Sequence, residues 1–100
     1  MSFWVYILRC ADGSYYAGHT DDLEKRMGEH ESGLVSAYTR KRRPLTLVFA
    51  DQYASRDAAL EREVQIKGWA RAKKEALIAG NWERLQRLSR GLHRVRLPVA

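Results

Sequence analysis

The sequence predicts a small α+β fold, in which helices flank a three-stranded, mostly antiparallel sheet in the order β-β-α-β-α-α, with an optional last helix. Three observations predict it. Near the N-terminus, aromatic and branched side chains alternate between two faces, as in a half-buried strand. An Asp-Gly turn leads into a second strand-like segment. Helix-capping residues and glycines bound most of the later segments. A chain of 100 residues has room for one domain with one modest core.

The first two strands are predicted over residues 3–9 and 14–19, joined at Asp12-Gly13. A third strand is predicted over residues 45–50, with Pro44 at its start, where proline is tolerated. Residues 34–44, between the first helix and this strand, are expected to form a loop.

The register of the hairpin has two solutions. A two-residue turn would pair Tyr6 with His19 and place Tyr16 on the opposite face of the sheet. A three-residue loop that ends in a left-handed Gly13 would pair Tyr6 with Gly18, and both tyrosines would then lie diagonally on one face. Ordinary strand tyrosines would also explain the pattern, since strands are rich in tyrosine.

Helix boundaries follow from capping residues. Asp21 or Asp22 can begin a helix that reaches about Ser32, and Gly33 can end it. Ser55 can begin a second helix, which Gly68 breaks or bends. A third helical piece ends at Gly80, and Asn81 can cap a short last helix. We therefore expect a main domain over residues 1–80 and a helical extension with a tail over residues 81–100.

Charge and cysteine content narrow the function classes. The net charge is +6 and the pI is near 9.8, which favours a polyanionic partner such as nucleic acid. Cys10 is the single cysteine, so an internal disulfide is excluded, and a reducing, cytoplasmic location is expected. No segment has the apolar length of a membrane span, so no membrane partner is expected.

Five motifs occur in order along the chain: Val5-Tyr6, then Tyr16-Ala17-Gly18, then Arg26, His30 and Glu63. This order resembles the GIY-YIG nuclease domain from about residue 3 to residue 78. The stretches "YYAGHT", "TRKRRP" and "EVQIKGW" resemble most the small stand-alone bacterial members of that family. Two positions depart from the family pattern: Trp4 replaces a glycine of the first motif, and Ala17 replaces an isoleucine of the second. Neither change removes a catalytic side chain.

The resemblance implies an endonuclease that hydrolyses phosphodiester bonds, preferably in DNA, and by extension a role in DNA repair. It implies one divalent metal ion, Mg²⁺ or Mn²⁺, held by Glu63. Tyr6 or Tyr16 would accept the proton of water, and Arg26 would grip the phosphate and, with the metal, lower the pKa of Tyr6. The implied catalytic residues are Tyr6, Tyr16, Arg26, His30 and Glu63, with Gly18 and His19 in support.

Each role has a plainer alternative. Glu63 can simply pair with Lys67, and Arg26 with Asp22, since each pair is four residues apart on a helix. His30 can relay a proton or lie on the helix surface. The whole domain can also be a nucleic-acid-binding module without catalysis.

Basic side chains outside the motifs are expected to hold the phosphate backbone rather than read sequence. They are Arg40, Lys41, Arg42, Arg43, Lys67 and Arg71. The chain has no room for a separate DNA-binding region, so a homodimer or a protein partner is a further expectation.

Overall fold

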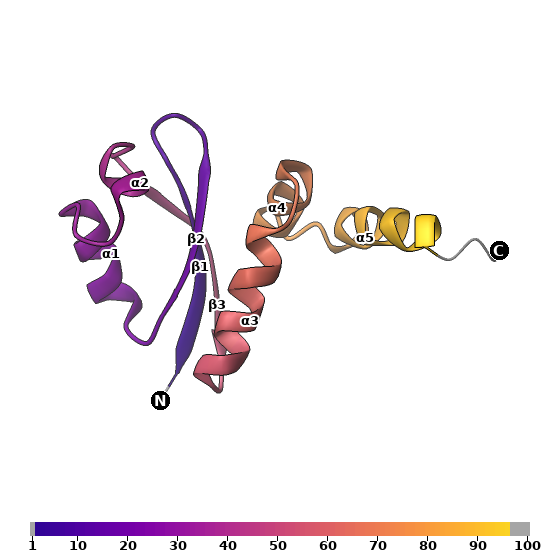
Figure 1. The fold of residues 1–100 in the computed structure, drawn as a ribbon, viewed down its shortest axis with the longest axis horizontal. Helices are drawn as coiled ribbons and strands as arrows, with labels where there is room; N and C mark the ends of the chain where they lie inside the picture. The colour runs from indigo at the N-terminus through magenta and orange to yellow at the C-terminus, as the bar shows by residue number, and fades with distance from the viewer. Residues whose placement is uncertain (1, 97–100) are drawn as a thin grey trace. The chain divides into compact units, whose positions relative to one another are not determined.

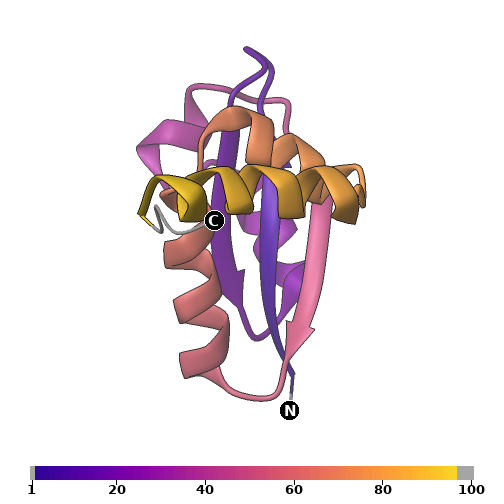
Figure 2. The same ribbon diagram turned by 90° about the vertical axis from the view of Figure 1, so that its right-hand side faces the viewer.

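The central strand of the sheet is β1 (Phe3–Arg9), which lies between β2 (Tyr15–Thr20) and β3 (Thr46–Tyr53). Both pairings are antiparallel, and the three strands lie side by side in Figure 2. The protein is represented by a computed structural model, which describes residues 2–96 and the side chains of residues 2–89. The predicted fold class is confirmed.

Helices cover both faces of this sheet (Figure 1). On one face lie α1 (Leu23–Glu31) and the one-turn helix α2 (Ala37–Arg40), and on the other lies α3 (Arg56–Lys67). These elements form one compact unit, Met1–Gly68. None of the described helices is long and apolar enough to cross a bilayer.

The second compact unit, Trp69–Ala100, contains α4 (Arg71–Ile78) and α5 (Trp82–Arg96). The two helices contact each other. Ala76 and Leu77 of α4 and Leu85 of α5 are buried. The short segment 79–81 joins the two helices.

Alternation along β1 divides the core between the two faces. Tyr6 and Leu8 point toward α1, where Tyr6 contacts His30. Val5 and Ile7 therefore point toward α3, and all four side chains are at most 1% exposed. The predicted two-faced character of the first strand is correct, and both of its faces are buried.

The helix ends follow the predicted signals. Asp22, Ser55 and Asn81 each accept a hydrogen bond from the backbone N–H three residues later, at 3.0 to 3.1 Å. Gly33 and Gly80 have φ angles of 78° and 67°, the left-handed conformation that ends a helix at low cost.

Three predicted boundaries differ from the structure. The segment expected to be a loop over residues 34–44 contains α2, because the hydroxyl of Ser36 caps one helical turn. β3 extends beyond the predicted strand to Tyr53, because its polar end pairs with the first residues of β1. α3 ends at Lys67 with Gly68 as its C-cap, in agreement with the predicted break at Gly68. α5 continues through the predicted tail to Arg96, and residues 97–100 of that tail lie outside the described residues.

Candidate active site

The hairpin adopts the register that gathers the two tyrosines. Tyr6 pairs with Gly18, and Leu8 pairs with Tyr16. The backbone N–H of Cys10 donates to the carbonyl of Ser14 at 2.8 Å, which closes a three-residue loop. Gly13 ends this loop with a φ angle of 85°, a conformation that glycine adopts without steric cost. Of the two registers that the sequence allows, the three-residue loop is correct.

Gly18 makes room for the Tyr6 side chain. The Tyr6 ring is fully buried and lies across β2. A Cβ atom on Gly18 would lie 2.5 Å from the Tyr6 hydroxyl oxygen and 2.6 Å from Cζ, well inside van der Waals contact. Glycine at this position therefore sets the direction of the Tyr6 hydroxyl.

Substituting alanine for Gly18 is expected to destabilise the protein by about 1–3 kcal/mol, because the added methyl group must displace a buried ring. Urea unfolding measures this change. Gly28→Ala is the matched control, because a Cβ at that helical position meets nothing within 4 Å. The control should be neutral or stabilising by up to about 1 kcal/mol, from helix propensity. Equal stability of the two variants would contradict this account of Gly18.

His30 connects the Tyr6 hydroxyl to a second buried hydroxyl. Tyr6 Oη lies 2.8 Å from His30 Nε2, and Thr39 Oγ1 lies 3.1 Å from His30 Nδ1. His30 is 1% exposed, so the alternative of a surface histidine is wrong. Ser36 Oγ continues the chain at 3.0 Å from Thr39 Oγ1. These contacts form a continuous hydrogen-bond network that runs from Tyr6 of β1 through His30 of α1 to Thr39 of α2 and its cap Ser36.

Burial keeps both members of the Tyr6–His30 pair neutral. It raises the pKa of Tyr6 far above the usual range of a phenol, and the neighbouring Tyr16 raises it further. The charge of Arg26 lowers the pKa of Tyr6, as expected from the sequence, but does not offset burial. Burial, followed by Arg26, lowers the pKa of His30.

The depressed pKa of His30 predicts a loss of stability in mild acid. In the unfolded chain the imidazole titrates near 6.5, and in the folded protein it titrates lower. Between these two pKa values the unfolded state binds more protons than the folded state. The contribution of His30 to the free energy of unfolding is therefore complete above pH 6.5 and decreases as the pH drops. The free energy of unfolding should therefore decrease by at most about 1.4 kcal/mol per pH unit on account of His30.

Urea unfolding between pH 7.5 and 5 would measure this effect in the wild type and in His30→Gln. Other titrating groups are present in both proteins, so they cancel to first order in the comparison. The wild type should lose more stability than the variant over this range. Parallel pH profiles would show that His30 is not the group responsible.

Tyr16 lies beside the same histidine. Its ring meets His30 edge to face, with 5.2 Å between centroids, and stacks on Tyr38 with 6.3 Å between centroids. The ammonium of Lys67 lies 5.7 Å from the Tyr16 ring centroid. Tyr16 is only half-buried, so it lies between the buried Tyr6–His30 pair and the surface.

Glu63 of α3 contacts β2 through His19. Its Oε1 accepts a hydrogen bond from His19 Nδ1 at 2.7 Å, and its Oε2 lies 3.0 Å from Lys67 Nζ. The residue is 8% exposed. Burial raises its pKa, but the hydrogen bonds from His19 and Lys67 outweigh burial, so the pKa lies below its ordinary value. Glu63 is therefore an ionised carboxylate whose negative charge also raises the pKa of Tyr6.

Arg26 lies one helical turn before His30. Its Nε lies 3.1 Å from Glu29 Oε1, and its side chain remains one-third exposed. The alternative pair with Asp22 is not the contact observed, because Asp22 caps α1. Arg26 is close enough to lower the pKa of both Tyr6 and His30. The structure thus brings together the motif residues Tyr6, Tyr16, Gly18, His19, Arg26, His30 and Glu63.

Two arginines of the segment that follows α2, Arg42 and Arg43, form contacts that hold this segment in place. Arg42 Nε pairs with Asp12 at 2.9 Å, and its guanidinium lies 3.7 Å from the Tyr38 ring centroid. Arg43 donates to the Glu31 carbonyl at 2.8 Å. Arg40 and Lys41 are exposed. Arg42 and Arg43 thus have structural contacts that the sequence did not predict, and their role toward nucleic acid stays a prediction.

Two other predicted phosphate-binding residues also have partners. Lys67 pairs with Glu63, and it is half-exposed. Arg71 belongs to the second unit, where it pairs with Glu75 at 3.2 Å.

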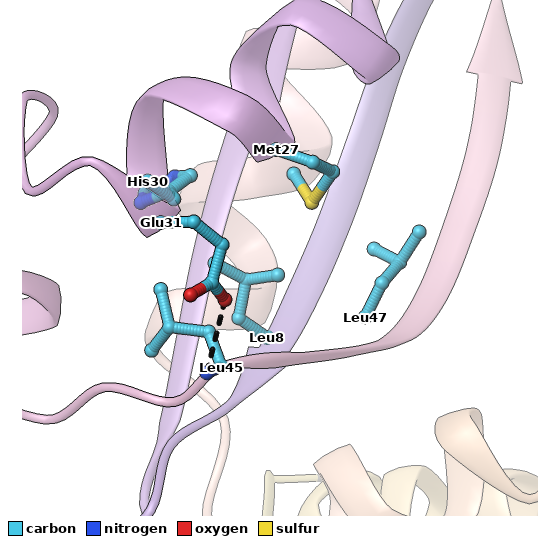
Figure 3. A pocket seen from close by; sticks show the side chains of 6 residues that line it. All are labelled: Leu8, Met27, His30, Glu31, Leu45 and Leu47. Carbon is cyan, nitrogen blue, oxygen red and sulfur yellow. Dashed lines mark hydrogen bonds between the residues drawn. The ribbon is translucent and has the colours of Figure 1, made fainter.

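A small cavity of about 220 Å³ lies between α1 and the start of β3 (Figure 3). Its wall is mainly apolar, and Glu31 Oε1 accepts a hydrogen bond from the Leu45 N–H across it at 3.2 Å. His30 is the one motif residue in its lining. A phosphate needs polar donors, so this cavity is not suited to the substrate implied by the motifs.

Comparison with known proteins defines the class of this fold and site. A sequence model of the GIY-YIG catalytic domain matches residues 2–76. The chain therefore belongs to the GIY-YIG family, a family of nuclease-type domains. The match covers the whole sheet and every motif residue named above.

Within that family, the chain is similar to small proteins named UPF0213 from bacteria and archaea. It is 46% identical to the protein from Natronomonas pharaonis over 76% of this chain and 89% of the relative. It is 45% identical to the protein from Bacillus pumilus over 75% of this chain and 76% of the relative.

Two solution NMR structures have similar folds. The UPF0213 protein BH0048 from Bacillus halodurans is 42% identical, with a TM-score of 0.53, over 79% of this chain and 84% of that chain. The protein EF2693 from E. faecalis is 36% identical, with a TM-score of 0.57, over 80% of this chain and 85% of that chain.

Proposed function

We propose that this protein is an endonuclease that hydrolyses phosphodiester bonds of nucleic acid, with DNA as the preferred polymer. One observation carries the proposal: a buried phenol, an arginine and an ionised carboxylate from three different elements lie near one another. Tyr6 comes from β1, Arg26 from α1 and Glu63 from α3, and both charges affect the pKa of the phenol. Binding a phosphate backbone requires cations, whereas a buried carboxylate repels phosphate and is better explained by catalysis.

Glu63 is the residue that would hold a divalent metal ion. Among residues 2–89, whose side chains the structure describes, no three or more histidine, cysteine, aspartate or glutamate side chains form a cluster that would enclose one. A single ionised carboxylate still fits Mg²⁺ or Mn²⁺, because Mg²⁺ retains most of its water and takes further ligands from substrate phosphates. When bound, such an ion supplies charge neutralisation at the phosphate. Lys67 and His19 contact the carboxylate in the structure. When the metal ion binds, each would either keep the carboxylate oriented or move aside to free an oxygen for the ion.

Tyr6 and His30 would move the proton of the attacking water. The phenol has a high pKa in the buried site, so it needs an acceptor for its own proton before it can take one from water. His30 Nε2 lies 2.8 Å from the phenolic oxygen and is neutral, so it can be that acceptor. Tyr16 lies nearer the surface, where its hydroxyl would orient water or phosphate.

Arg26 would bind the phosphate. Its guanidinium is partly exposed and can donate two parallel hydrogen bonds to phosphate oxygens. Its partner Glu29 is also exposed, so exchange of this pair for a phosphate costs little. The exposed basic residues Arg40 and Lys41 would add salt-dependent, sequence-independent attraction.

A cleavage assay tests the proposal. Supercoiled plasmid, single-stranded DNA, branched DNA and RNA would each be incubated with the protein in Mg²⁺, in Mn²⁺ and in EDTA. Cleavage that requires the metal is the expected result. Anisotropy on the same substrates at two salt concentrations would run in parallel. Salt-sensitive binding without cleavage of any substrate would instead establish a binding module.

A further inference from the structure

The buried hydroxyl of Thr39 contacts the ring nitrogen of His30 that does not face Tyr6. Thr39 Oγ1 lies 3.1 Å from His30 Nδ1, and Thr39 is fully buried. On the other side of the ring, Tyr6 Oη lies 2.8 Å from Nε2. A neutral imidazole carries one proton, on either nitrogen, and its two neighbours decide which nitrogen holds it.

The direction of the Thr39 hydroxyl follows from Ser36. Thr39 Oγ1 lies 3.4 Å from the Ser36 backbone carbonyl, which can only accept a hydrogen bond, and 3.0 Å from Ser36 Oγ. Ser36 Oγ already accepts from the Thr39 backbone N–H at 3.2 Å. A Thr39 hydroxyl that donates to the Ser36 carbonyl presents its lone pairs to His30 and can accept a hydrogen bond from Nδ1–H.

The helix α2 keeps Thr39 in this place. Ser36 caps that single turn, and α2 packs against α1, which carries His30. After α2, Arg42 is tied to Asp12 of the hairpin loop and Arg43 to the Glu31 carbonyl at the end of α1. These contacts hold the segment that follows Thr39 against the hairpin loop and the end of α1, and so help to keep the Thr39 hydroxyl beside His30 Nδ1.

We propose that Thr39 is a positioning residue that holds His30 as the Nδ1–H tautomer and so leaves Nε2 free to accept the proton of Tyr6. The purpose of this tautomer rests on the proposed function, whereas the tautomer itself does not. In the reaction, the Tyr6 O–H bond breaks and an N–H bond forms at Nε2. The phenolate oxygen takes a proton from water, and the resulting hydroxide forms a P–O bond while the P–O bond to the leaving oxygen breaks. The leaving oxygen takes a proton from solvent. His30 then returns its proton to the Tyr6 oxygen as the Tyr6 hydroxyl gives its proton to solvent, which restores both side chains.

NMR of protein with ¹⁵N-labelled histidine tests the tautomer directly, through couplings between ring protons and both ring nitrogens. The His30→Gln variant assigns the His30 signals. The wild type should show His30 protonated on Nδ1. Thr39→Val should lose this preference and lower the cleavage kcat about tenfold, the effect of one neutral hydrogen bond, with KM unchanged. Thr39→Ser should restore both.

Thr20→Val is the matched control, because Thr20 is a buried threonine whose hydroxyl contacts Asp22 instead of His30. It should leave the His30 tautomer as in the wild type. A wild type protonated on Nε2, or a Thr39→Val variant that keeps the Nδ1–H form, would overturn the inference. If Thr39→Val does not fold, the wild-type spectrum alone still decides the tautomer. Absence of cleavage in every protein would count against the proposed function, and the spectra would decide the role of Thr39 separately.

Discussion

Replacing Glu63 by glutamine is expected to abolish metal-dependent cleavage while the protein keeps its fold. The amide has nearly the shape of the carboxylate but no charge, so it binds Mg²⁺ or Mn²⁺ poorly. A catalytic metal supplies several kcal/mol of transition-state stabilisation, so the rate should fall at least about a thousandfold. In the ion pair with Glu63, the Lys67 side chain is half-exposed to solvent. Loss of this pair should therefore lower the free energy of unfolding only slightly.

Glu61→Gln is the matched control, because Glu61 lies on the same helix and is exposed. Both variants and the wild type would be purified identically and assayed on the same DNA, with circular dichroism to verify folding. The control should cleave like the wild type. Equal cleavage by Glu63→Gln and wild type would show that the nuclease in the preparation is a contaminant or that Glu63 has no catalytic role.

Replacing Arg26 by alanine should reduce the single-turnover cleavage rate about 100- to 1,000-fold, because a preorganised donor at the phosphate is lost. Stability should change by less than about 1 kcal/mol, since the Arg26–Glu29 pair is partly exposed. Arg26→Lys should recover part of the rate, because lysine supplies the charge without the planar pair of donors. Without Arg26 the pKa of Tyr6 should rise further, since the arginine charge lowers it.

Arg56→Ala separates this effect from general loss of positive charge. Arg56 is an exposed arginine that pairs with Asp21 at 3.5 Å, so it matches Arg26 in being a surface arginine with an acidic partner. It should retain nearly full activity at moderate salt. A similar loss in both variants would show that Arg26 contributes only to the overall attraction of nucleic acid.

Local signals predicted much of the fold. Capping side chains at Asp22, Ser55 and Asn81 act within a few residues of their own position, so their effect can be read from short segments. The site residues could be named for the same reason, because the family motifs are short and occur in a fixed order. Gly18 is an example: a motif glycine in sequence, it proves to be the place where the Tyr6 ring crosses β2.

Other features depend on contacts between distant residues, which composition and spacing do not define. The hairpin had two allowed registers, and the positions of Tyr6 and Tyr16 differed between them. Thr39 was visible only as a neighbour of a basic run, whereas its partner is a histidine nine residues earlier, brought close by an unpredicted helical turn. Likewise, the bond between Arg42 and Asp12 joins residues thirty positions apart and gives an expected phosphate ligand a structural contact that spacing does not predict.

The first strand of the chain is also the middle strand of the sheet, and this has a consequence for biosynthesis. As the protein leaves the ribosome, β1 and β2 can pair at once, but β1 remains open on its other edge until residues up to Tyr53 have emerged. The carboxylate of Glu63 arrives later still, on α3. A nascent hairpin therefore displays both tyrosines without the acidic group, and the motif residues come together only after α3 has folded. The proposed nuclease activity would accordingly require synthesis of the chain through Lys67.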